Sequence, residues 1–244
     1  MCPVEKGTSL SLEAFILKDM STPSTTRTAQ RLTLVTLVIL ALALVGFIVY
    51  RQVAPQGSAT TPASGDIDVS GQPMLGQKDA PVEIAVFEDF KCPACRFFDE
   101  NVFPEVKREL IDTGQARIYF LNYPFIGPDS TTAAMAGECV YNQKPEAFWD
   151  YKTYVFRSQG DESKAWATPA FLADIARNNL SGLDADALQS CTADKTYAEQ
   201  VSTEKAMGDA AGVQGTPSIF VDGQRLESFE FSAVQTAVKN AQAD

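Results

Sequence analysis

The residues on either side of Cys92 and Cys95 constrain the fold more than any other part of the chain. Residues 82–90 are rich in Val, Ile and Phe and are typical of a buried strand. After the cysteines, apolar residues recur at helical spacing as far as Gly114, and residues 116–124 form a second strand-like run. A strand, a helix and a strand in this order predict a parallel βαβ unit with both cysteines at the start of its helix.

The rest of the chain predicts an α/β fold that contains a helical insertion. Residues 127–211 carry helical patterns that are separated by Gly, Pro and Asp. A short strand at residues 218–221 follows and ends in the hairpin turn Asp222-Gly223. A last helical pattern covers residues 232–243. We therefore expect one α/β domain over residues 72–244, interrupted by a helical insertion at about 127–211.

An uncharged apolar run at residues 32–50 predicts a membrane anchor. Its 19 residues, LTLVTLVILALALVGFIVY, are flanked by Arg31 and Arg51. As a helix the run is about 28 Å long, close to the ~30 Å hydrocarbon core of a bilayer. A buried helix of a soluble domain is the alternative, but such a helix seldom lacks a polar position over this length. No A-x-A cleavage pattern follows directly, which favours an uncleaved anchor over a cleaved signal peptide.

Charge and composition around this run predict the topology of the chain. Arg27 and Arg31 precede the run and only Arg51 follows it closely, which favours a cytoplasmic tail at residues 1–31. Residues 51–71 are rich in Pro, Gly, Ser and Thr and predict a flexible linker. The domain beyond the linker is then extracytoplasmic, in the periplasm or at the cell surface. The net charge of −11, with no basic run, argues against nucleic acid as a partner.

Cys92 and Cys95 have the spacing of a redox-active pair. Cys92 precedes a helix, where backbone N–H groups and the helix dipole favour a thiolate. Pro93 suits the first helical position because no N–H donor is needed there. Cys95 lies one turn further on the same side, so it can close a disulfide with Cys92 or attack a mixed disulfide on it. The motif therefore supplies both a nucleophile and a resolving thiol.

A metal site and an inert disulfide are the other uses of such a motif. A structural zinc ion takes four Cys or His ligands, but the chain has no His, and Cys139 and Cys191 do not form a second CxxC. An inert disulfide is compatible with an extracytoplasmic domain. However, a CxxC that follows a buried strand and begins a helix is the context of redox motifs. We therefore favour redox activity and expect neither a metal nor a cofactor.

The motifs VEIAVFEDFKCPACRFF and GVQGTPSIFVDG, some 120 residues apart, resemble those of the DsbA-like thiol:disulfide oxidoreductases of the thioredoxin superfamily. The resemblance covers residues 72–244 and implies a thioredoxin fold with an inserted helical domain, in a bacterial protein. It also implies that Thr216-Pro217 is a cis peptide beside the CxxC, where the backbone of an extended substrate docks. An ordinary trans peptide before a strand is the alternative.

Two positions depart from the pattern of that family. Many relatives carry an acidic residue six positions before the first cysteine, thought to move protons for the second, and here that position is Val86. Glu88, two residues later on the same strand face, either takes this role or is a solvated charge at the sheet edge. Oxidising relatives often have His between the cysteines, where this chain has Pro93 and Ala94. We expect the pKa of Cys92 to be lowered, but less than in the most oxidising relatives.

Cys139 and Cys191 are predicted to form a structural disulfide within the helical insertion. The predicted topology places both in an oxidising compartment, where distant cysteine pairs usually form disulfides. The bond closes a loop of about 50 residues, worth roughly 4 kcal/mol in the chain-entropy model. Similar pairs in some DsbA-like proteins agree with this pairing. Two buried free thiols, or a role in relaying electrons, are the alternatives.

Together these features predict a membrane-anchored enzyme that forms or exchanges disulfides in extracytoplasmic proteins. Cys92 is the expected attacking sulfur, Cys95 the resolving thiol, and Thr216 with Pro217 the docking edge for an unfolded or reduced secreted protein. The resemblance implies that a membrane thiol oxidase linked to quinone reoxidises the enzyme. Two alternatives use the same residues differently: an extracytoplasmic thiol reductase, for instance in cytochrome c maturation, and a chaperone-like binding module without catalysis.

Overall fold

The computed structural model describes residues 37, 44 and 67–243 of the chain. The predicted cytoplasmic tail, most of the predicted linker and the predicted membrane span lie outside these residues, apart from Leu37 and Leu44 of the span. Within the described part of the chain, no helix combines the length and the apolar character needed to cross a bilayer. The anchor therefore stays a prediction from the sequence.

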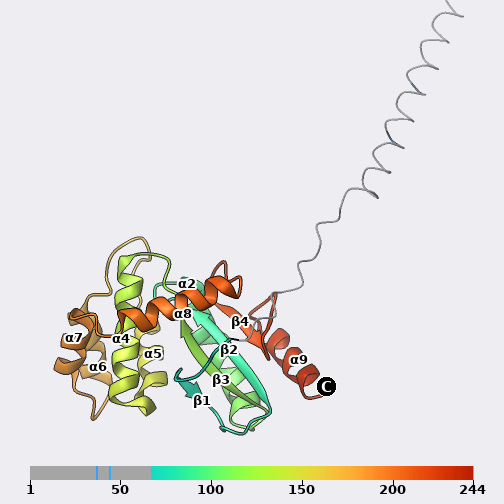
Figure 1. Cartoon of the computed structure of the whole chain (residues 1–244), viewed down its shortest axis with the longest axis horizontal. Helices are drawn as coiled ribbons and strands as arrows, with labels where there is room; N and C mark the ends of the chain where they lie inside the picture. The colour runs from blue at the N-terminus through green and yellow to red at the C-terminus, as the bar shows by residue number, and fades with distance from the viewer. Residues whose placement is uncertain (1–36, 38–43, 45–66, 244) are drawn as a thin grey trace, which may run out of the picture. The chain divides into compact units, whose positions relative to one another are not determined.

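A five-stranded mixed sheet forms the centre of residues 67–243 (Figure 1), with strand order β1-β3-β2-β4-β5. β2 and β3 pair in parallel and the other neighbours are antiparallel. The parallel pair is the predicted βαβ unit. The sequence patterns missed β1, because a two-residue strand is too short to show alternation. The strands are β1 (Met74–Leu75), β2 (Val82–Glu88), β3 (Ala116–Asn122), β4 (Ser218–Val221) and β5 (Gln224–Arg225).

One long helical segment connects β2 to β3 and carries the two cysteines at its start. Two π-helical turns, η1 and η2, lie on either side of Pro104, which cannot donate the backbone hydrogen bond of a regular helix. The helical segment therefore continues past this proline through wide turns instead of ending there. The parts of the segment are α2 (Pro93–Phe97), η1 (Phe98–Val102), α3 (Phe103–Val106) and η2 (Lys107–Ile111).

The helical insertion lies between β3 and β4, as the sequence predicts. Figure 1 shows α4 to α7 gathered beside the sheet, α8 leading back to β4, and α9 at the other end of the domain. Gly208 allows α8 to lie against β3, because a Cβ there would come within 2.6 Å of the Tyr123 ring. The elements are α4 (Pro128–Gln143), η3 (Pro145–Ala147), α5 (Phe148–Arg157), α6 (Pro169–Asn179), α7 (Ala185–Ala193), α8 (Ala198–Ala210) and, after the sheet, α9 (Phe231–Ala241).

Alternation along β2 divides the sheet core into two faces. Val82, Ile84 and Val86 belong to a cluster with the long helical segment and α9. Ala85 and Phe87 point the other way, into a cluster that includes apolar residues of β3 and β4. Two residues of the predicted linker, Ile67 and Val69, pack against this second cluster, so the packed unit begins before residue 72.

A third apolar cluster fills the insertion and reaches the active-site cysteines. It contains Phe148, Tyr151 and Phe156 from α5 together with Cys92 and Cys95. The aromatic run in α5 is therefore core, and this core continues into the redox motif. As a result, the insertion and the CxxC share one packed interior.

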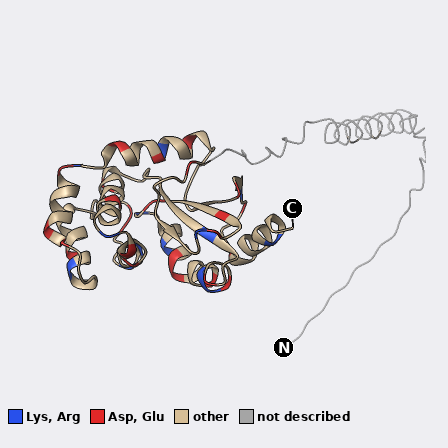
Figure 2. Ribbon diagram, turned by 60° about the horizontal axis from the view of Figure 1, so that its bottom comes forward, with Lys and Arg blue, Asp and Glu red and all other residues tan. Residues whose placement is uncertain are grey.

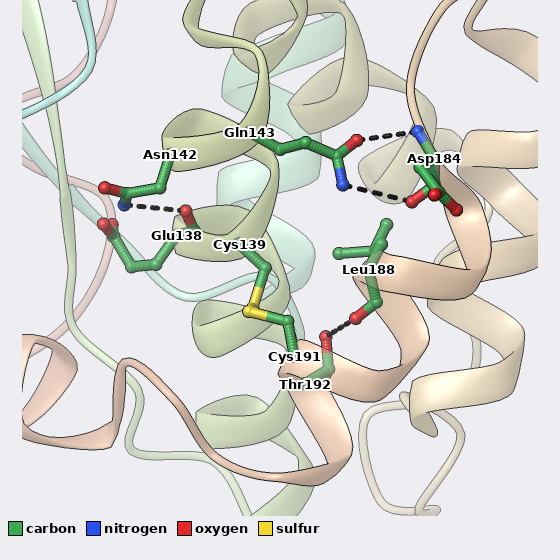
Figure 3. Close-up of a disulfide and its surroundings, with 8 residues drawn as sticks. All are labelled: Glu138, Cys139, Asn142, Gln143, Asp184, Leu188, Cys191 and Thr192. Atoms are coloured by element: carbon green, nitrogen blue, oxygen red, sulfur yellow. Dashed lines mark hydrogen bonds between the residues drawn. A yellow bond between two sulfur atoms is a disulfide. The ribbon is translucent and has the colours of Figure 1, made fainter.

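A disulfide joins α4 to α7 within the insertion (Figure 3), between Cys139 and Cys191. Next to it, the Gln143 side chain donates to the Asp184 carbonyl and accepts from the Asp184 backbone N–H, at 3.2 and 2.7 Å. Cys139 is buried, and the bond lies in the same apolar cluster as the aromatic residues of α5. This is the pairing that the sequence suggested.

Buried carboxyl groups attach the insertion to β3. The Asn122 side chain donates to Glu138 of α4 and to Glu204 of α8, both at 3.0 Å. Burial and the neighbouring Glu204 raise the pKa of Glu138 to about 8, and burial raises the pKa of Glu204 to about 7. At neutral pH the two carboxyl groups therefore share protons rather than both carrying charge.

Candidate active site

Cys92 and Cys95 lie where β2 gives way to the long helical segment, and both are thiols in this structure. Cys92 caps the helix with an extended backbone, at φ −75° and ψ 121°, and Pro93 takes the first helical position. The exposed fraction is 7% for Cys92 and 0% for Cys95. Only the first sulfur therefore borders the surface, and the second lies beneath it.

The loop before β4 approaches Cys92 from the far side of the sequence. The Thr216–Pro217 peptide is cis, which excludes the ordinary trans peptide. The Cys92 Sγ–H donates to the Thr216 carbonyl at 3.3 Å. Because β4 pairs with β2, the loop before β4 lies beside Cys92, although Thr216 is 124 positions later in the chain. The CxxC motif and the motif that contains Thr216 and Pro217 therefore meet at the sulfur of Cys92.

The two thiols differ sharply in acidity. A hydrogen bond from Cys95 lowers the pKa of Cys92 to about 6, assisted by Thr216 and by the backbone N–H groups of Ala94 and Cys95, while burial opposes the shift. Burial raises the pKa of Cys95 well above its ordinary value, and the nearby Glu88 carboxylate raises it further. The Cys92 shift has the direction expected from the sequence. Near neutral pH, Cys92 is a thiolate and Cys95 a thiol.

Glu88, at the end of β2, is buried beneath the cysteines with an exposed fraction of 1%. The alternative of a solvated edge charge is therefore wrong, because β3 and β4 flank β2 on both sides and the insertion covers this end of it. Burial raises the pKa of Glu88 to about 7, against the opposing attraction of Lys152. Lys152 Nζ lies 3.3 Å from Glu88 Oε1 and 2.7 Å from Asp99 Oδ1.

The backbone that leads into Cys92 is held by side chains on both sides. The Asp89 carboxylate accepts hydrogen bonds from the backbone N–H of Lys91 at 2.8 Å and of Phe125 at 2.9 Å. The Gln159 side chain, just beyond α5, donates to the carbonyl of Cys92 at 3.0 Å. Lys91, itself buried, pairs with Asp129 of α4 at 2.7 Å. The insertion therefore fixes the position of the redox motif.

Sequence reasoning missed Asp99, Lys152 and Gln159. One signal for Lys152 was present in α5, where apolar residues recur at Phe148, Val155 and Phe156 and the lysine falls on the same buried face. A lysine at an apolar position of a helix predicts a buried ion pair, but its partners lie 53 and 64 positions earlier in the chain. Figure 2 shows Asp, Glu, Lys and Arg residues on many of the helices, so charge alone does not mark the buried ones.

Comparison with known proteins decides the family. The model of the family described as thioredoxin matches residues 68–240. The chain belongs to the thioredoxin family. It is 34% identical over 166 residues to the disulfide bond formation protein D of Bacillus subtilis, covering 68% of this chain and 74% of that protein. It is 37% identical to the probable disulfide bond formation protein D of Bacillus anthracis, covering 69% of this chain and 77% of that protein.

Solved structures of thioredoxin-family proteins agree with this assignment. Oxidised BdbD from Bacillus subtilis superposes with a TM-score of 0.72 at 31% identity, covering 75% of this chain and 99% of that one. DsbA from Chlamydia trachomatis gives a TM-score of 0.66 at 28% identity, covering 71% and 93%. The chain is therefore a DsbA-like thiol:disulfide oxidoreductase with a thioredoxin fold and an inserted helical domain, as predicted from the two motifs.

Proposed function

We propose that this thioredoxin-family chain introduces disulfides into extracytoplasmic proteins through Cys92 and Cys95. The observation that carries the proposal is the asymmetry of the two thiols. The pKa of the outer sulfur is lowered to about 6, and burial raises the pKa of the inner one. A stabilised thiolate is a good leaving group, so a mixed disulfide on Cys92 transfers readily to a substrate thiol.

The chemistry proceeds in two exchanges. A substrate thiolate attacks Cys92 of the oxidised pair, and Cys95 leaves and takes up a proton. A second substrate thiolate then attacks the substrate sulfur of the mixed disulfide and releases Cys92 as a thiolate. The substrate loses two electrons and gains a disulfide, and the pair is left reduced. Thr216 and Pro217 are the proposed docking edge, supported by the 3.3 Å contact between Cys92 and the Thr216 carbonyl.

Glu88 is the proposed proton carrier for Cys95. The carboxyl group is 1% exposed and its charge raises the pKa of Cys95, which indicates that the two groups are close. With its own pKa raised to about 7, Glu88 can release and take up a proton near neutral pH. Many relatives carry an acidic residue at the position of Val86. In this chain, Glu88 takes its role from two residues later on the same strand face.

The cellular setting follows from the sequence. The apolar run at residues 32–50 is the proposed anchor, and it holds the domain outside the cytoplasm. The reduced pair passes its two electrons to a membrane thiol oxidase that is linked to quinone. The proposed substrates are unfolded or reduced secreted proteins, whose extended backbone fits a docking edge beside the nucleophile.

Oxidative refolding of reduced ribonuclease A tests the proposal. The full chain in detergent micelles, with glutathione disulfide as the terminal oxidant, is expected to accelerate the recovery of ribonuclease activity. Cys92→Ser should lose this effect, whereas the matched replacement of both Cys139 and Cys191 by Ser should keep most of it. A chain that suppresses aggregation equally well with Ser at position 92 is a binding module, and this result would overturn the proposal.

A further inference from the structure

We infer that Lys152 of the helical insertion is a positioning residue that, together with Asp99, sets the pH at which Cys95 attacks. The inference rests on the proposed redox role of the cysteine pair and on Glu88 as the proton carrier. It adds that two further charges act on Glu88 in opposite directions. One comes from the insertion and the other from the helical segment that carries the cysteines.

The Lys152 side chain is completely buried between the two carboxyl groups. Its exposed fraction is 0%, and Nζ lies 2.7 Å from Asp99 Oδ1 and 3.3 Å from Glu88 Oε1. Four aromatic rings surround the ammonium group, with centroids 4.6 to 6.0 Å from Nζ. They shield it from water and add cation–π attraction. These rings belong to Phe103, Phe120, Trp149 and Phe156.

The charges around Glu88 come from three elements. α5 contributes Lys152, η1 contributes Asp99, and the start of the long helical segment contributes Cys92 and Cys95. One buried cation thus faces two carboxyl groups and a thiolate. One oxygen of Glu88 and one of Asp99 have no hydrogen-bond partner among the described residues. Because the acidic groups of this site outnumber its cation, one of them holds a proton. The charges of the neighbouring groups decide which one it is.

Lys152 and Asp99 have opposite effects on Glu88. The ammonium group lowers the pKa of Glu88, and the Asp99 carboxylate raises it. Burial opposes the charge of Lys152, but the carboxylates of Glu88 and Asp99 raise the pKa of Lys152 overall, so the lysine stays charged. The two neighbours therefore adjust in opposite directions the pH above which Glu88 is an ionised base.

The reaction step that depends on this base is the attack of Cys95 on a mixed disulfide at Cys92. The Cys95 proton passes to the Glu88 carboxylate, and the Cys95 sulfur bonds to the Cys92 sulfur. The bond from Cys92 to the external sulfur breaks, and the external thiolate leaves. Atoms, charge and electrons balance without another reactant. The rate of this step should rise with pH around the pKa of Glu88.

Stopped-flow reaction of the full chain, with Cys2 replaced by Ser, the Cys92–Cys95 pair reduced and the Cys139–Cys191 disulfide intact, with excess Ellman's reagent isolates this step. The first thiolate released reports attack by Cys92 and depends on the reagent concentration. The second release, independent of that concentration, reports attack by Cys95. Removing the cation with Lys152→Met should move the pH midpoint of the second release up by about one unit or more. Removing the opposing anion with Asp99→Asn should move it down by about one unit.

Matched variants separate this tuning from a structural role. Lys152→Arg keeps the cation and should restore the wild-type midpoint. Lys144→Met removes a half-buried lysine of the insertion that donates to the Ser181 carbonyl, away from Glu88, and it should leave both midpoints unchanged. Asp99→Asn retains Lys152, so it tests the inference even if Lys152→Met fails to fold. A structural role predicts lost stability with unmoved midpoints.

Midpoints that stay fixed, or that move in the same direction in Lys152→Met and Asp99→Asn, overturn the inference and leave the proposed function intact. Absence of a second release in the wild-type chain instead overturns the proposed redox pair itself. The two failures are therefore distinguishable in one experiment.

Discussion

The two cysteine pairs of this chain show how position decides what a disulfide does. Cys92 and Cys95 are three positions apart at a helix start, and one of them borders the surface. Cys139 and Cys191 are 52 positions apart and join two helices of the insertion. Both pairs border the same apolar cluster of the insertion, but only the first has neighbours that act on its protons in the structure described.

The difference follows from what surrounds each sulfur. At the first pair, a hydrogen bond from Cys95, assisted by N–H groups at the helix start, lowers the pKa of Cys92, and the Glu88 carboxylate raises the pKa of Cys95. At the second pair, the two sulfurs are bonded to each other in the insertion core, so neither is available as a thiolate. The reactivity of a cysteine pair therefore depends on the groups that surround its sulfurs. Without such groups, a disulfide contributes to the fold by closing a loop of the chain.

The largest expected effect distinguishes the pairs by activity. Cys92→Ser removes the sulfur that forms the mixed disulfide, so ribonuclease refolding should fall to the uncatalysed rate. The double replacement of Cys139 and Cys191 by Ala should leave most of this activity at a temperature where the variant is folded. Loss of activity in the folded double variant would contradict the division of roles.

The second effect distinguishes the pairs by stability. Replacing Cys139 and Cys191 by Ala opens a loop with a sequence separation of 52, and it should lower the free energy of unfolding by about 4 kcal/mol. Urea denaturation, followed by circular dichroism, measures this loss. Reduction of the first pair opens a far shorter loop and should change stability less by chain entropy. An equal effect from both pairs would refute this comparison.

The third effect concerns the proton carrier of the first pair. Glu88→Gln removes the base for Cys95, and the second release from Ellman's reagent should slow by about 100-fold and lose its pH dependence near 7. The first release, which reports Cys92, should change far less. Glu138→Gln is a matched control, since it removes another buried carboxyl group with a raised pKa in the insertion. Equal slowing in both variants would assign the effect to folding.

The smallest effect is the dependence of stability on pH. The folded pKa of Cys92, about 6, lies below the ordinary value of 9.0, so its thiolate stabilises the folded reduced chain fully above pH 9. This contribution is lost as the pH falls through 6, and at pH 7 it is about 1 kcal/mol. Thiolate absorbance and urea denaturation against pH measure it, with Cys92→Ser as the control. A midpoint near 9 would contradict the account.

Local patterns in the sequence sufficed for the parts of this fold that are built from neighbouring residues. The run before Cys92, the helix start at Pro93 and the turn at Asp222 each depend on a few adjacent residues, and each lies where it was predicted. The resemblance of two distant motifs supplied the contact between Cys92 and Thr216. Neither periodicity nor propensity alone brings those two residues together.

The remainder of the site depends on tertiary packing. Glu88 was ambiguous in the sequence, because alternation places it on a strand face but does not say what covers that face. Lys152 covers it from α5, and Asp99 completes the group from η1. The buried face of α5 marks Lys152, but no local pattern identifies its partners, because they lie in distant segments of the chain. Only the packed structure shows that the insertion supplies a charge to the redox site.

The reduction potential of the Cys92–Cys95 pair tests the central claim most directly. The full chain with Cys2 replaced by Ser is equilibrated in detergent with glutathione buffers, and alkylation of Cys92 and Cys95 gives the fraction of oxidised pair. The account predicts a potential above about −180 mV, towards the disulfide-donating end of the thioredoxin-family scale. A potential near about −270 mV would identify a reductase and contradict the assignment of this pair as a disulfide donor.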